Sequence, residues 1–156
     1  MPRTPLEPPS VLTMPVTGPT RARRPRTGYL SGSFDRFGGA QLDGLRRARR
    51  HCDRLVVGVL TDDVVTRRTG ATPSVPLADR LTLVRHLDLV DDALPQADGD
   101  DLTAWPALHY DVLVVDEVPL LVPGAVGTTA ALDRALAAAA LGVQVVRLPV
   151  GHLALA

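Results

Sequence analysis

The sequence of 156 residues contains no lysine, a single cysteine and few aromatic residues. Arginine is therefore the only strongly basic residue type, so any lysine role of a related protein must here be filled by a guanidinium or lost. One thiol cannot form an internal disulfide, which fits a reducing compartment. Because Phe, Trp and Tyr make up 3% of the chain, the core must consist mainly of Leu, Val and Ala.

The chain also lacks a net charge and a long apolar run. Its 17 basic and 17 acidic residues cancel, so no overall field attracts nucleic acid or an anionic membrane. No apolar run approaches the roughly 20 residues that a membrane-spanning helix needs, and the N-terminus has no hydrophobic signal core. We therefore expect a cytoplasmic protein that has neither a membrane nor a nucleic acid as its partner.

Residues 1–27 differ in composition from the rest of the chain. They hold half of the 14 prolines, and proline at that density blocks both helices and central strands. We expect a disordered tail, followed by one domain that spans residues 28–156. The tail ends in an arginine cluster, for which a solvated segment is favoured over a weak phosphate or nucleic-acid contact. The cluster comprises Arg21, Arg23, Arg24 and Arg26.

From residue 29 onward, short apolar runs alternate with helical patterns. Strands are predicted at 29–33, 55–60, 90–94, 111–115 and 143–148. Helices are predicted at 41–51, 77–89, within 98–110 and at 128–141. The polar stretch 64–76, broken by Gly70, Pro73 and Pro76, is predicted to be a loop. This alternation indicates an α/β fold, namely a Rossmann-like open parallel sheet with helices on both faces.

In such a sheet, ligands bind beyond the carboxyl ends of the strands, where the strand order reverses. The segments that end at this edge are 32–35, 61–63 and 116–117. A glycine in the first of them lets the backbone approach a phosphate closely. All three segments are therefore candidate places for a site.

The segment that runs from Gly32 to Gln41 reads GSFDRFGGAQ. It resembles the cytidylyltransferase signature G-[ST]-F-D-x-x-H-x-G-H, which joins the first strand of that family to its first helix. Later segments are similar to further family motifs in the same order. They are CDRLVVGV at 52–59, DRLTLV at 79–84, VDDA at 90–93 and YDVLVVD at 110–116. Together they make the chain similar to nucleotidyltransferases of the glycerol-3-phosphate cytidylyltransferase type.

The resemblance implies CTP, or less often ATP, as the nucleotide, a small phosphorylated alcohol as the acceptor, and Mg²⁺ if the protein is active. It also implies a homodimer or pairing with a related protein. Arg68, or its neighbour Arg67, takes the place of a family lysine. Arg80 has two equally favoured interpretations, a residue of the site and a surface or dimer-contact charge. The resulting candidate nucleotide-binding residues are Gly32, Ser33, Phe34, Asp35, Gly38, Gln41, Arg68, Arg80 and Asp116.

The sequence departs from the family at groups that would contact phosphate. Gly38 and Gln41 stand where the signature has histidines, and Val115 stands where a strand-end glycine is usual. After the last predicted strand, residues 149–156 lack the arginine and hydroxyl cluster of the family's last motif. Since losing one preorganised donor costs roughly 10²–10³ in rate, we assign no catalytic residue and no metal ligand. We expect a transferase with lost or strongly reduced activity; the alternative is a non-catalytic domain that binds a nucleotide or a partner.

Overall fold

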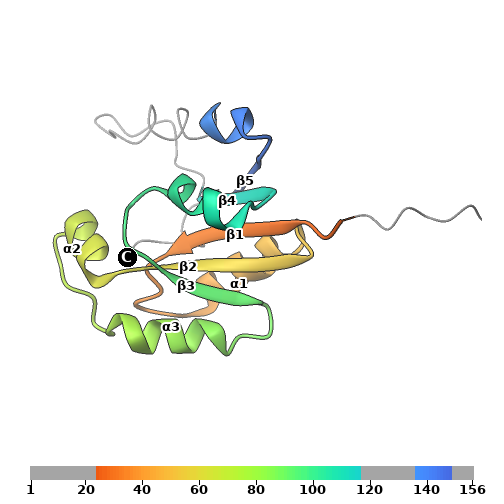
Figure 1. Cartoon of the computed structure of the whole chain (residues 1–156). Coiled ribbons are helices and arrows are strands. Elements are labelled where there is room, and N and C mark those ends of the chain that lie inside the picture. The colour runs from red at the N-terminus through yellow and green to blue at the C-terminus, as the bar shows by residue number, and fades with distance from the viewer. Residues whose placement is uncertain (1–23, 117–135, 149–156) are drawn as a thin grey trace, which may run out of the picture.

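The computed structural model describes residues 24–116 and 136–148, and these form an α/β domain around one sheet (Figure 1). Its five strands are all parallel and lie in the order β3-β2-β1-β4-β5. They are β1 (Thr27–Gly32), β2 (Arg54–Leu60), β3 (Asp92–Gln96), β4 (Val112–Asp116) and β5 (Gln144–Leu148). The strand order reverses between β1 and β4, so the predicted Rossmann-like parallel sheet is confirmed.

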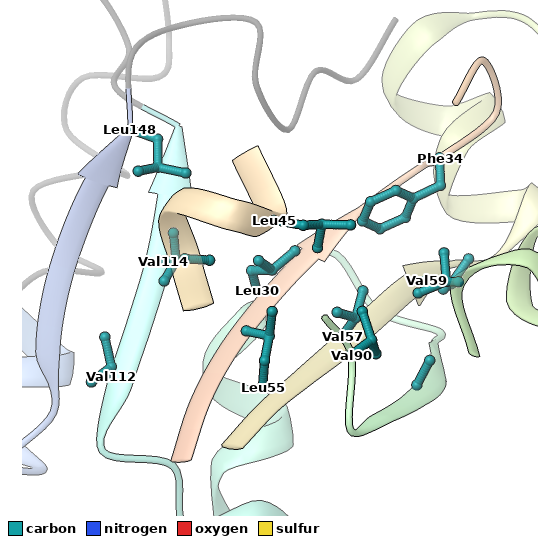
Figure 2. Close-up of a cluster of buried hydrophobic side chains, with 13 residues drawn as sticks. Leu30, Phe34, Leu45, Leu55, Val57, Val59, Val90, Val112, Val114 and Leu148 are labelled. Atoms are coloured by element: carbon teal, nitrogen blue, oxygen red, sulfur yellow. The ribbon is translucent and has the colours of Figure 1, made fainter. Parts of the chain in front are cut away.

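Apolar residues cover both faces of this sheet, as parallel strands require. The first face packs Leu30 and Val57 against Leu45 of α1 (Gly39–Arg49) (Figure 2). The helix α3 (Leu77–Arg85) adds Val84 to the same cluster. The second face lies under η1 (Asp101–Ala104), α4 (Trp105–Leu108) and the helical residues 136–140. The expectation of helices on both faces is therefore confirmed.

The loop predicted at 64–76 is wrong in its first half, because α2 (Asp62–Thr69) occupies it. The Thr61 side chain caps this helix by accepting from the backbone N–H of Val64, and Gly70 ends it in the left-handed conformation, with φ of 77°. Acidic residues lie in its first turn and basic residues in its last turn, which suits the helix dipole. The helix therefore forms despite its polar composition, because these end signals favour it and because two of its valines are buried against the end of β2.

The residues before β1 contact the amino edge of the sheet. Arg24 forms an ion pair with Asp111, whose other oxygen accepts from the backbone N–H of Thr27 at 2.9 Å. The backbone N–H of Arg26 donates to Asp53 at 2.7 Å. The remainder of the expected tail, residues 1–23, lies outside the described residues, as do residues 128–135 of the predicted last helix. Within the described part of the chain, no helix is both long enough and apolar enough to cross a membrane.

Gly58 is a packing constraint that can be tested directly. A Cβ at this position would lie 2.1 Å from the Tyr29 hydroxyl oxygen, and the Tyr29 side chain is fully buried. We expect Gly58→Ala to lower the free energy of unfolding by about 1–3 kcal/mol, measured by urea denaturation. Gly39→Ala is the matched control, because no atom lies within 4 Å of its added Cβ, and it should change stability by less than about 0.5 kcal/mol. Equal effects of the two substitutions would contradict this account of the sheet.

Candidate functional site

The turn between β1 and α1 has a strained backbone that a buried ring holds in place. Phe34 has φ of 53°, a left-handed conformation that is unusual for a bulky residue. Its side chain is 3% exposed, packs in the core of the first face and lies 6.3 Å from the Phe37 ring, centroid to centroid. Such strain persists only where the surroundings over-determine it, and it is concentrated at functional sites. The buried ring therefore fixes the path of the backbone from Gly32 to Asp35.

The sheet opens beside this turn. β1 pairs with β2 along its whole length, whereas its pairing with β4 is recorded only at Gly28–Val112 and Tyr29–Leu113. Among the described residues, the ladder between β1 and β4 therefore stops well before the carboxyl ends of both strands. This is the point where the strand order reverses, and where ligands of open α/β sheets bind. The sequence predicted a site where the strand order reverses, but it indicated neither the two strands involved nor the early end of the ladder between them.

The amino end of α1 lies at the same edge and is favourable for an anion. Gly38 precedes the helix in an extended conformation, and Gly38, Gly39 and Ala40 are exposed. The first turn of α1 has no acidic residue, so the partial positive charge of the helix end is not neutralised there. The Gln41 side chain folds back and accepts a hydrogen bond from the Gly38 backbone N–H at 3.0 Å.

The amino end of α2, which follows β2 at the same edge, has the opposite character. Asp62 and Asp63 lie in its first turn, and the Thr61 hydroxyl already caps it. Two carboxylates disfavour a phosphate at this helix end. Of these two helix ends, the one of α1 is therefore better suited to phosphate.

Arg80 is the main buried charge of the region, with 1% of its surface exposed. Its Nε donates to the Val75 carbonyl at 2.8 Å, and one terminal nitrogen, Nη1, donates to the carbonyls of both Ser33 and Leu60. It also forms an ion pair with Asp62. The interpretation of Arg80 as a surface or dimer-contact charge is therefore wrong, because the guanidinium is enclosed and bonded within the domain. It holds the β1–α1 turn, the end of β2 and the start of α2 together.

Asp35 joins the turn to the segment before α3. Its Oδ1 accepts from the Val75 backbone N–H at 2.7 Å. Partial desolvation raises the pKa of this carboxyl, but hydrogen bonds from Ser74 and Val75, together with the charge of Arg80, outweigh it and hold the pKa below its ordinary value. The carboxylate therefore contributes to the shape of the turn in its ionised form.

The other predicted residues lie at different places along the edge. Arg68 is exposed on α2 and donates to the carbonyl of Gly99, in the loop after β3. That contact is on the β2–β3 side of the sheet, away from the junction of β1 and β4. Asp116 ends β4, and only its backbone is described. The structure thus brings Gly32–Asp35, Gly38, Gln41 and Arg80 together and gives Arg68 a separate contact.

The sequence did not indicate a set of hydrogen-bonded polar side chains that is buried on the second face. Ser31 Oγ donates to Asp101, which is 7% exposed, and the Tyr110 hydroxyl donates to the Asp101 carbonyl at 2.9 Å. The Tyr29 hydroxyl donates to Gln96 Oε1 at 2.6 Å. Burial, and next the charge of Asp101, raises the pKa of Tyr29. These partners are far apart along the chain, so no local pattern indicates them.

Comparison with known proteins decides the family. Residues 29–148 match the model of the family described as "Cytidylyltransferase-like", which includes every described element from β1 to β5 except the first two residues of β1. The chain belongs to the cytidylyltransferase-like family. A solved structure with the same fold is the lipopolysaccharide core biosynthesis protein from Thermoplasma volcanium, with a TM-score of 0.64 and 22% identity over 80% of this chain and 96% of that one.

Two curated proteins are similar to parts of this cytidylyltransferase-like chain. Ethanolamine-phosphate cytidylyltransferase from Arabidopsis thaliana is 36% identical over 77 residues, which are 49% of this chain and 18% of that protein. The bifunctional protein HldE from Halorhodospira halophila is 42% identical over 95 residues, which are 60% of this chain and 20% of that protein. The chain thus matches about a fifth of the length of these relatives.

Removing the Arg80 guanidinium tests its structural role. Arg80→Met should lower the free energy of unfolding by about 3–5 kcal/mol, because Asp62 and three carbonyls lose their common donor. Arg85→Met on the same helix is the matched control. Arg85 is exposed and its Nε donates to a single carbonyl, that of Ala93, at 3.0 Å, so the substitution should cost no more than about 1 kcal/mol. Should Arg80→Met prevent folding, Arg80→Lys serves as the milder variant. Urea denaturation gives these values, and similar costs at the two positions would contradict a special role for Arg80.

The lowered pKa of Asp35 predicts how its contribution depends on pH. A carboxyl whose pKa is depressed by folding stabilises the protein above its unfolded pKa, about 3.9, and that contribution is lost as the pH falls through the folded pKa. The stability difference between the unsubstituted protein and Asp35→Asn should therefore be largest above about pH 5 and shrink in more acidic solution. Asp88→Asn, at an exposed position, is the control. A difference for Asp35→Asn that does not change with pH would refute the assignment.

Proposed function

We propose that the chain binds a nucleoside triphosphate, with CTP as the first candidate and ATP as the second, at the junction of β1 and β4. We further propose that it transfers the nucleotidyl group to a small phosphorylated alcohol at a strongly reduced rate. The observation that carries this proposal is the amino end of α1. It follows β1 beside the reversal of strand order, has no acidic residue in its first turn, and has Gly38 and Gln41 at the positions of the family's histidines. Membership of the cytidylyltransferase-like family supports the reaction class.

The reaction explains why these two positions matter. An oxygen of the acceptor's phosphate attacks the α-phosphorus of the nucleotide, the bond to the bridging oxygen breaks, and pyrophosphate leaves. Charge develops on the phosphate oxygens, so positioned cations and donors lower the barrier. Gly38 has no side chain, and Gln41 offers only a neutral amide. Backbone groups can therefore still bind the phosphates, while the extra stabilisation of the transition state is reduced.

A magnesium ion is part of the proposal only as the partner of the triphosphate. Within residues 24–116 and 136–148, no three His, Cys, Asp or Glu side chains are grouped so that they could hold a metal ion. Asp62 is committed to Arg80. Because Mg²⁺ is commonly held by substrate phosphates together with one or two carboxylates, it would enter as MgCTP.

Binding and turnover are tested separately. MgCTP should raise the melting temperature of the protein more than MgATP does, and calorimetry gives the dissociation constants. Pyrophosphate release with glycerol 3-phosphate or ethanolamine phosphate should be at least about 10²-fold slower than for a family member that retains both histidines. A comparable rate would refute the reduced activity, and the absence of any nucleotide effect would refute the site. Binding of CTP without any turnover would identify the alternative, a non-catalytic nucleotide-binding domain.

Restoring the histidines tests how much else is missing. We expect Gly38→His combined with Gln41→His to recover less than about a tenth of the rate of that family member, because residues 149–156 also lack the family's arginine and hydroxyl cluster. The measurement is pyrophosphate release, with Gly38→Ala/Gln41→Ala as the matched control. Full recovery would show that the two histidine positions alone limit the reaction. Assembly as a homodimer or with a related protein stays a prediction, to be checked by sedimentation.

A further inference from the structure

The Gln41 side chain occupies a donor at the helix end where the proposed nucleotide site lies. Its amide faces the Gly38 backbone N–H, with 3.0 Å between the nitrogen and Oε1. A backbone N–H can only donate, so the atom that faces it must be the amide oxygen rather than the amide nitrogen. Gly38 is the residue that precedes α1 and Gln41 is in its first turn, so this contact closes the helix end from within.

A bound phosphate would need the same place. The N–H groups at a helix amino end have no partner within the helix and are the donors that a phosphate oxygen accepts from. In this structure Oε1 accepts the hydrogen bond from the Gly38 N–H. The negative end of the amide dipole therefore lies where a phosphate oxygen would have to accept. An added Cβ on Gly38 would find only Gln41 Oε1, at 3.6 Å, and the Arg36 carbonyl, at 3.9 Å, within 4 Å. Among the described residues, the amide oxygen is therefore the side-chain atom that lies beside Gly38.

We propose that Gln41 sets the phosphate affinity of the site as an internal competitor, whose amide oxygen must leave the Gly38 N–H before a phosphate oxygen can accept from it. This inference rests on the proposed function, because it concerns the same site. It assigns Gln41 a role that differs from the predicted one. Gln41 weakens the binding of the nucleotide's phosphates, whereas the sequence comparison treated it as a poor replacement for a phosphate donor.

Two substitutions separate this role from a purely structural one. Gln41→Ala removes the competitor and the cap together, so the protein should be less stable but bind MgCTP and inorganic pyrophosphate about 2- to 10-fold more tightly. Gln41→Glu keeps a side-chain acceptor at the right distance and adds a negative charge, so the protein should be as stable but bind both probes more weakly. A merely structural cap predicts the reverse order, in which affinity falls together with stability.

The measurements are isothermal calorimetry with both probes and urea denaturation of each variant. Gln144→Ala is the matched control, because the Gln144 side chain accepts from Arg26 at the amino edge of the sheet, and its affinity should not change. Gln41→Met, which keeps the side-chain length without the amide, replaces Gln41→Ala if the latter does not fold. Unchanged or weaker binding by Gln41→Ala, or by Gln41→Met in its place, overturns the inference while the proposed function stands. Failure of every protein, unsubstituted or variant, to bind either probe overturns the proposed function itself.

Discussion

The buried guanidinium of Arg80 is the interaction on which the geometry of this edge depends. A charge that is 1% exposed is tolerated only when its donors are satisfied, and here Asp62 and three backbone carbonyls satisfy them. Those partners belong to the β1–α1 turn, the end of β2, the start of α2 and the segment before α3. One side chain therefore connects four segments that the sheet alone would leave independent, and Asp35 reinforces the connection through Val75.

This connection also distinguishes the two helix ends at the edge. Asp62 has to lie in the first turn of α2 in order to reach Arg80, and its carboxylate makes that helix end unsuitable for phosphate. The amino end of α1 has no such residue, and the strained Phe34 backbone directs the chain into it. The ion pair that stabilises the edge thus also sets the charge of the α2 end, while the α1 end has no acidic residue in its first turn.

The sequence predicted the parts of the fold that depend on local patterns. Buried strands such as β2 are visible as apolar runs, and the order of strands and helices led to the correct sheet and family. The prediction failed for α2, where cap residues outweigh polar composition, and for the interpretation of Arg80 as a surface or dimer-contact charge. The acceptors of Arg80 lie up to 47 residues away along the chain, so helical periodicity could not reveal its burial. The early end of the β1–β4 ladder and the Ser31–Asp101 contact depend on tertiary structure in the same way.

The replaced histidines show how binding and catalysis can separate in this fold. Binding a phosphate at a helix end relies on backbone N–H groups and the helix dipole, which the strained turn and α1 supply whatever side chains follow. Stabilising the charge that develops during transfer relies on side-chain cations, which Gly38 and Gln41 cannot provide. Gln41 also engages one of the backbone donors, so the proposed competition would act on the ground state, while the missing histidines would act on the transition state. For that reason the fold shared with the family supports the proposed location of the site, and the chemistry at positions 38 and 41 supports the proposed loss of rate.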